Sequence, residues 1–125
     1  MAEQDVADKL AELLRGFQIS TPGVLGAAVI SVDGFAVASE LPEGVEERRV
    51  AAMAAATLAL GEQTTSELDH GPLQRVFVEG SDGYTIIMSA GPEAVLSAVA
   101  RKDAKLGLVF LHMERTADGV RTAMG

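Results

Sequence analysis

The sequence of 125 residues contains 18 acidic and 10 basic side chains, which gives a formal net charge of −8, and it has no cysteine. A chain of this length forms one domain, and its core must be aliphatic because only 4% of its residues are aromatic and tryptophan is absent. The lack of cysteine excludes disulfides, cysteine-ligated zinc and a thiol nucleophile. The negative charge argues against binding to nucleic acid or to an anionic membrane. The first ten residues are acidic and lack an apolar run, so we expect no signal peptide and a cytoplasmic location.

The first elements are a helix and a hairpin. Apolar side chains recur at helical spacing over residues 3–17, with carboxylates on the opposite side, which predicts an amphipathic helix. Pro22-Gly23 then breaks the chain. The β-rich runs 25–32 and 35–39 follow, and Asp33-Gly34 between them predicts a hairpin because both turn positions accept positive φ.

A long helix is predicted over residues 43–69, closed by Gly71-Pro72. Residues 50–61 carry no charge, and a helix that is apolar all round has no face left for water. We therefore expect its second side to contact another chain. Helical projection gives the long helix one side suited to packing on a sheet, made of Val50, Met53, Ala54, Thr57, Leu60, Thr64 and Leu68. The opposite, outer side is made of Arg48, Ala52, Ala55, Ala59 and Ser66.

The last part of the chain is less clear from its pattern. A second hairpin is predicted from strands at 73–79 and 84–90. Periodicity leaves 94–100 and 106–113 open between strand and helix, because short apolar runs fit either. Residues 119–125 are sparse in core side chains, so we expect a flexible tail after an ordered core at about 3–118.

Most catalytic motifs are missing from the sequence. None of the three lysines follows a glycine and precedes serine or threonine, so there is no P-loop, and neither Gly-x-Gly nor Gly-x-Ser-x-Gly occurs. His70 and His112 lie far apart without a zinc-ligand pattern. Asp33 and Asp82 each precede a glycine and are interpreted as turn residues. We expect no catalytic residue, no cofactor, no metal and no small-molecule substrate.

Several motifs nevertheless occur in a familiar order. The segment 21–27 (Thr-Pro-Gly-Val-Leu-Gly-Ala) leads into 29–35, followed by the alanine-rich 51–61 and by Asp82-Gly83-Tyr84. Over about residues 5–118 the chain resembles the Roadblock/dynein light chain family, in the bacterial and archaeal branch that includes the MglB-type regulators of Ras-like GTPases.

The resemblance implies a fold and an assembly. The fold would be a single-domain α+β sandwich in the order α-β-β-α-β-β-β-α, with a five-stranded antiparallel sheet, the long central helix on one face and the terminal helices on the other. Residues 93–101 would form the fifth strand and residues 104–118 the final helix. The family also implies a homodimer in which the strands at 73–79 pair edge to edge and the long helices lie side by side.

Two functions follow from the resemblance. The first is a non-catalytic homodimeric regulator that binds a Ras-like small GTPase and positions its catalytic residues, with an arginine finger from Arg48 or Arg49 as a second route. The second is a homodimeric adaptor that leaves nucleotide turnover unchanged. A small enzyme or ligand binder is a third reading, which the missing motifs disfavour. The predicted partner and dimer interface comprises Arg48, Arg49, Ala51, Ala52, Ala55, Ala56, Leu58, Ala59, Glu62, Gln63, Leu73, Arg75 and Phe77.

Overall fold

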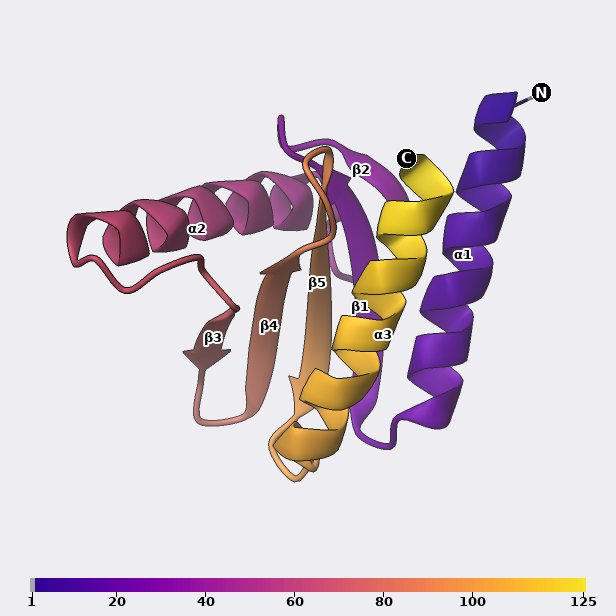
Figure 1. Cartoon of the computed structure of the whole chain (residues 1–125). Coiled ribbons are helices and arrows are strands. Elements are labelled where there is room, and N and C mark those ends of the chain that lie inside the picture. Colours follow the sequence, from indigo (N-terminus) through magenta and orange to yellow (C-terminus); the bar gives the residue numbers. More distant parts are fainter. Residues whose placement is uncertain (1) are drawn as a thin grey trace.

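The computed structural model describes the backbone of residues 2–125 and the side chains from Asp5 onward (Figure 1). Within this range three helices and five strands follow the expected order. Their bounds are α1 (Ala2–Ser20), β1 (Val24–Ser31), β2 (Ala36–Glu40), α2 (Glu47–Glu67), β3 (Val76–Glu79), β4 (Gly83–Ser89), β5 (Ala94–Arg101) and α3 (Leu106–Met124).

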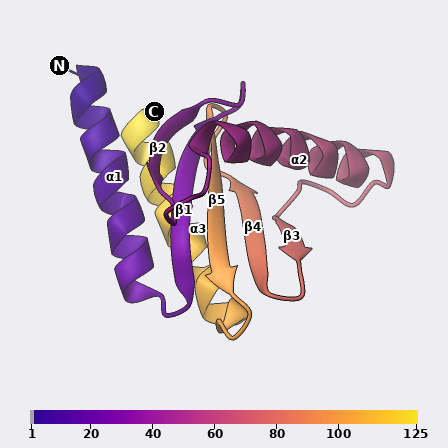
Figure 2. The ribbon, with the colours of Figure 1, turned by 180° about the vertical axis from the view of Figure 1, so that it is seen from behind.

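The strands form one antiparallel sheet in the order β2-β1-β5-β4-β3. Helix α2 lies across one face, and α1 and α3 cover the other (Figures 1 and 2). The predicted α+β architecture is therefore confirmed. The Asp33-Gly34 turn is also present: Gly34 has a φ of 92°, and its N–H donates to the Ser31 carbonyl at 2.9 Å.

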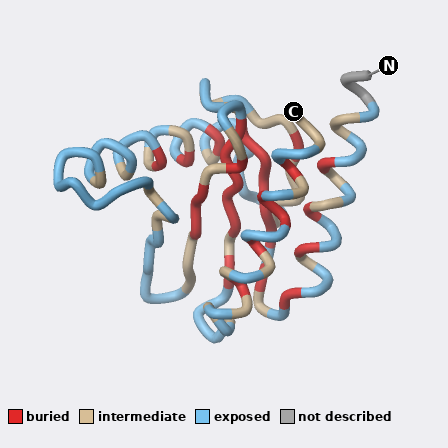
Figure 3. Tube along the Cα trace, in the orientation of Figure 1, coloured by how far each residue is buried: buried red, intermediate tan, exposed pale blue. Residues whose placement is uncertain are grey.

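The core has two unequal halves (Figure 3). Between the sheet and the α1–α3 pair lies the larger cluster, which includes Leu10, Leu14, Leu96 and Met113. Beneath α2 lies a smaller cluster in which the helix contributes Ala51, Ala54 and Leu58 as its buried side chains. The α2 contact is thin because two of these three side chains are alanine.

Helix α2 shows that the predicted rotation was wrong. The side chains expected to pack on the sheet include Met53, Leu60 and Leu68, which are 55%, 64% and 57% exposed. Of the predicted inward set Ala54 is buried, but the sheet also receives Ala51 and Leu58, so the buried side is centred roughly one residue, or about 100°, further round the helix. Small residues let α2 lie close to the strands, and projection by hydrophobicity alone does not detect that advantage.

Gly61 lies where α2 packs closely on side chains at the start of β3 and just before it. A Cβ built on Gly61 would lie 2.7 Å from Cγ2 of Val76 at the start of β3 and 3.1 Å from Cδ2 of Leu73. A side chain at this position would push the helix away from the strand. The helix also spans Glu47–Glu67 and is shorter at both ends than the predicted 43–69.

The C-terminal segment differs from the expected flexible tail. Helix α3 continues to Met124, and Val120 within it is fully buried. Gly119 lies against α1, where an added Cβ would lie 3.0 Å from Cδ2 of Leu13. Gly119 permits close packing of α3 on α1, and Val120 is buried beside it. These two contacts are enough to hold a segment that has few large apolar residues.

We expect Val120→Ala to lower the free energy of unfolding by about 1–3 kcal/mol, because it leaves a cavity in the α1–α3 side of the core. Urea denaturation followed by circular dichroism measures this. The matched control Thr122→Ala changes an exposed side chain on the same helix and should stay within about 0.5 kcal/mol of the unmodified chain. Equal stability of the two variants would contradict the ordered C-terminal turns.

Candidate functional site

Strand β3 leaves one edge of the sheet unpaired within the described chain, because it lies last in the strand order. The Gly80 N–H donates to the Gly83 carbonyl at 2.9 Å, which makes these two residues a hydrogen-bonded pair. Since such pairs alternate along antiparallel strands, the backbone groups of Phe77 and Glu79 point to the open edge. An unprotected edge of this kind is a template for strand pairing.

An apolar groove of about 230 Å³ runs between α2 and the sheet and opens beside β3. Its helix side is formed by Val50, Met53, Ala54 and Thr57, and its sheet side by Val78, Thr85, Ile87, Ser97 and Val99. We call it the α2–β3 groove. Val78 is 49% exposed at its rim, and the buried Ser97 hydroxyl has no hydrogen-bond partner within residues 5–125. The groove is therefore an apolar surface with one unsatisfied polar group.

Large apolar side chains continue from the groove along α2. Met53 and Leu60 are seven residues apart, which places them on one side of α2, and Leu68 follows directly after the helix ends at Glu67. All three are more than half exposed. A row of exposed apolar side chains next to an apolar groove indicates a surface that another protein covers.

The side of α2 that faces away from the sheet carries small and charged side chains. The exposed residues here are Arg48, Arg49, Ala52, Ala56, Ala59 and Gln63, which we call the α2 platform. Arg49 Nη2 lies 3.8 Å from Glu46 Oε2, and both side chains are well exposed. Arg48 has no ion pair within residues 5–125. The platform therefore offers two solvated guanidinium groups beside a flat strip of alanines.

Below β3, on the opposite face of the sheet, aromatic side chains pack together. The Phe77 ring centroid lies 5.0 Å from that of Tyr84 and 6.1 Å from that of Phe110. Lys102 lies over the Tyr84 ring and bonds to Glu79, and this hydrogen bond raises the pKa of Lys102 above its usual value. These contacts hold β3 in place on the face of the sheet opposite α2.

The structure divides the predicted interface residues. Ala51 and Leu58 are buried against their own sheet, so the prediction that they contact a partner is corrected. Ala55 is half-buried, and Leu73 packs beside Gly61. Arg75 bonds to Glu114 at 2.9 Å and lies 4.5 Å from the Phe110 ring centroid, which turns it away from the α2 side. The other predicted interface residues on α2 are exposed, namely Arg48, Arg49, Ala52, Ala56, Ala59, Glu62 and Gln63.

Sequence reasoning missed the groove itself. Met53, Thr57 and Val50 were assigned to the helix–sheet contact, and Val78 was not singled out. The available signal was the alternation along β3, where Val76 and Val78 share one side of the strand and Phe77 takes the other. Within residues 5–125 no group of three or more His, Cys, Asp or Glu side chains could hold a metal ion. None of the described helices is long and apolar enough to cross a membrane.

Comparison with known proteins places the chain in a family. The Roadblock/LC7 domain model matches residues 9–100. An uncharacterized protein of Methanocaldococcus jannaschii, MJ0714, is 36% identical over 121 residues, which cover 97% of this chain and 98% of that protein. The Roadblock/LC7 domain from Streptomyces avermitilis superimposes with a TM-score of 0.85 at 22% identity, over 91% of this chain and 96% of that one. A structure described as MglB with tetrameric arrangement gives 0.86 at 23% identity, over 94% and 89%. The chain belongs to the Roadblock/LC7 family.

Proposed function

We propose that the protein is a non-catalytic homodimeric regulator of a Ras-like small GTPase. The observation that carries this proposal is the α2–β3 groove, which joins an exposed apolar row on α2 to an open strand edge. The family and the MglB structures of the same fold support a regulatory or adaptor role.

Pairing of β3 with a second copy would satisfy the open backbone groups of Phe77 and Glu79. Antiparallel pairing of identical strands is self-complementary about a two-fold axis, as a closed dimer requires. It would bring the partner's α2 over the groove, where Met53 and Val78 are still exposed in the single chain. The same contact would therefore bury both the strand edge and the apolar row.

The α2 platform would stay exposed in such a dimer, because it lies on the side of α2 away from the sheet. Two platforms side by side would offer the GTPase a surface of alanines bordered by Arg48 and Arg49. Arginines are enriched among the residues that contribute most to binding at protein interfaces. We propose that this surface positions catalytic residues of the GTPase, with an inserted arginine as the alternative route.

For the dimer, we expect light scattering at micromolar concentration to give twice the chain mass of 13.0 kDa. Val78→Asp should reduce the mass to that of one chain, because it places a carboxylate in an apolar contact. Val32→Asp is the matched control, since Val32 is 50% exposed and Val78 is 49% exposed. A monomeric unmodified protein, or a dimeric Val78→Asp variant, would refute this arrangement.

For the GTPase, we expect addition of the protein to raise the rate of phosphate release by a Ras-like GTPase from the same genome. Ala59→Arg should abolish this increase without changing the dimer mass, whereas Thr122→Arg on α3 should change neither. If the protein positions residues of the GTPase, Arg48→Ala and Arg49→Ala should each reduce the stimulation by about tenfold or less. An inserted arginine predicts a loss of about a thousandfold or more. Binding without a change in rate would favour the adaptor function.

A further inference from the structure

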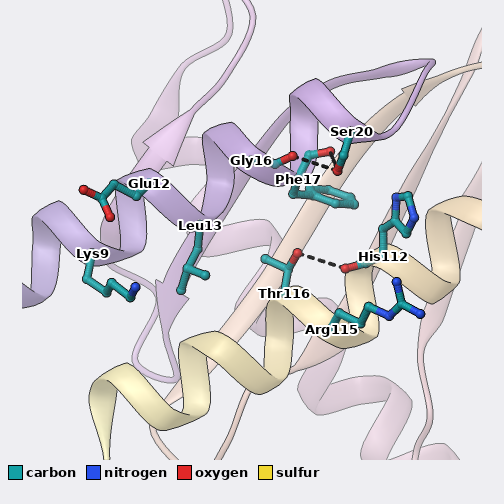
Figure 4. Close-up of a pocket in the computed structure, with 9 residues that line it drawn as sticks. All are labelled: Lys9, Glu12, Leu13, Gly16, Phe17, Ser20, His112, Arg115 and Thr116. Carbon is teal, nitrogen blue, oxygen red and sulfur yellow. Dashed lines mark hydrogen bonds between the residues drawn. The ribbon is translucent and has the colours of Figure 1, made fainter.

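The face of the sheet opposite α2 carries a second groove, between α1 and α3 (Figure 4). It has a volume of about 540 Å³ and is open to solvent. Helix α1 contributes Lys9, Glu12, Leu13, Gly16, Phe17 and Ser20 to it. Helix α3 contributes His112, Arg115 and Thr116. We call it the α1–α3 groove.

The floor of this groove is apolar in practice. Phe17 is buried within it, and Leu13 is half-buried. The two hydroxyls that line it already have partners, since Ser20 Oγ donates to the Gly16 carbonyl at 2.7 Å and Thr116 Oγ1 to the His112 carbonyl at 2.9 Å (Figure 4). Polar contacts with a bound molecule are therefore left to the side chains at the ends of the groove.

Three charged side chains line the groove: Lys9 and Arg115 are cationic, and the third is Glu12, which lies near Lys9 on α1. Arg115 and His112 lie together near Ser20, and Lys9 lies nearer Leu13 (Figure 4). Six other cationic side chains form ion pairs, but neither Lys9 nor Arg115 does so with any side chain of residues 5–125. The Nδ1 of His112 shares a 2.7 Å hydrogen bond with the buried Thr21 hydroxyl, which leaves Nε2 for a bound molecule.

Gly16 lines the groove, and no packing contact requires a glycine there. Glycine inside a helix costs about 0.5–1 kcal/mol relative to alanine. A glycine in a helix is usually explained by a positive φ or by a close contact that leaves no room for a Cβ. Neither applies to Gly16, which has no positive φ and whose Cβ position would have nothing within 4 Å. The contrast with Gly61, whose Cβ position lies 2.7 Å from Val76, shows that packing does not explain Gly16.

We propose that the α1–α3 groove binds an acidic amphipathic peptide segment of a partner protein. From Lys9 to Ser20 the groove extends about 16 Å, enough for three helical turns or about five extended residues. Apolar side chains of the segment lie on Phe17 and Leu13, and carboxylates bind Arg115 and Lys9 at either end. A compact small molecule would need a more enclosed cavity.

This site goes beyond the proposed function because it lies on the other face of the sheet from α2 (Figures 1 and 2). A segment bound between α1 and α3 therefore does not compete with a protein bound on α2 or with strand pairing at β3. The protein would connect the bound partner to whatever occupies the α2 platform.

The test is a selection from a phage-displayed library of random peptides of about 15 residues. The library is selected on the unmodified protein and counter-selected on the Arg115→Glu variant. We expect the remaining peptides to contain Asp or Glu on either side of an apolar core. In fluorescence anisotropy, a synthetic peptide of that sequence should bind the Arg115→Glu variant about tenfold more weakly than the unmodified protein. It should bind the Lys9→Glu variant at least about threefold more weakly. Lys105→Glu, an equal charge change outside the groove, should leave its affinity within about twofold.

The location and the ligand class are checked separately. The peptide should shift the backbone amide signals of residues 9–20 and 112–116, and stimulation of a GTPase should be the same for Arg115→Glu as for the unmodified protein. The proposal is overturned if counter-selection removes no peptide, if the enriched peptides are basic, or if the shifts lie on α2. It is also overturned if Arg115→Glu abolishes binding to phosphatidylserine vesicles while no peptide binds, or if millimolar inorganic phosphate alone displaces the peptide.

Discussion

The close approach of α2 to the sheet determines what the rest of the molecule exposes. Alanines at 51 and 54 and the missing side chain at Gly61 let the helix lie against β3 and its neighbours. The large apolar side chains of the helix, such as Met53 and Leu60, are consequently turned away from its own core. A contact made through small residues buries little apolar area. Burial of apolar area is the main favourable contribution to folding, at about 25 cal/mol per Å², so this contact stabilises the chain only weakly. The α1–α3 face must therefore supply most of the stability of the single chain.

The two faces of the sheet differ accordingly. The α1–α3 face holds the larger buried cluster and an aromatic group made of Phe77, Tyr84 and Phe110. The α2 face holds a cluster of seven buried hydrophobic side chains and leaves an apolar groove beside β3. Exposed apolar surface on a small domain indicates contact with another protein. The structure thus separates a face that stabilises the fold from a face suited to association.

Local chemistry in the sequence predicted the two hairpins and the two helices that precede them, but not the last two elements. Asp33-Gly34 predicts a turn with positive φ at both positions; the turn is present, but only Gly34 has a positive φ and Asp33 does not. The prediction of a strand at 93–101 and of a helix at 104–118 came from the family resemblance, because short apolar runs such as Val95-Leu96 and Val109-Phe110 fit either structure. Local pattern also could not show that Val120 is buried, since that depends on the distance between α1 and α3.

The sequence pattern could not predict which side of α2 faces the sheet, for a different reason. Its sides differ little in hydrophobicity, so the choice between Ala51 and Met53 as the inward residue is made by the distance to the strands. Small side chains allow a shorter distance, and shape complementarity decides between faces of similar polarity. The polar α2 residues were easier to place, because the charged Arg48, Arg49 and Glu62 and the amide Gln63 are rarely buried without partners.

The antiparallel packing of α1 and α3 brings the first residues of α1 and the last residues of α3 to the same end of the molecule, on the side away from β3 (Figures 1 and 2). Chain ends that lie close together are what circular permutation requires. A short linker could therefore close the backbone into a ring without crossing α2, and the exposed turn at Glu43-Gly44 could serve as the new opening. In such a permutant the long helix would come first in the chain, while the groove beneath it and the edge of β3 would keep their surroundings.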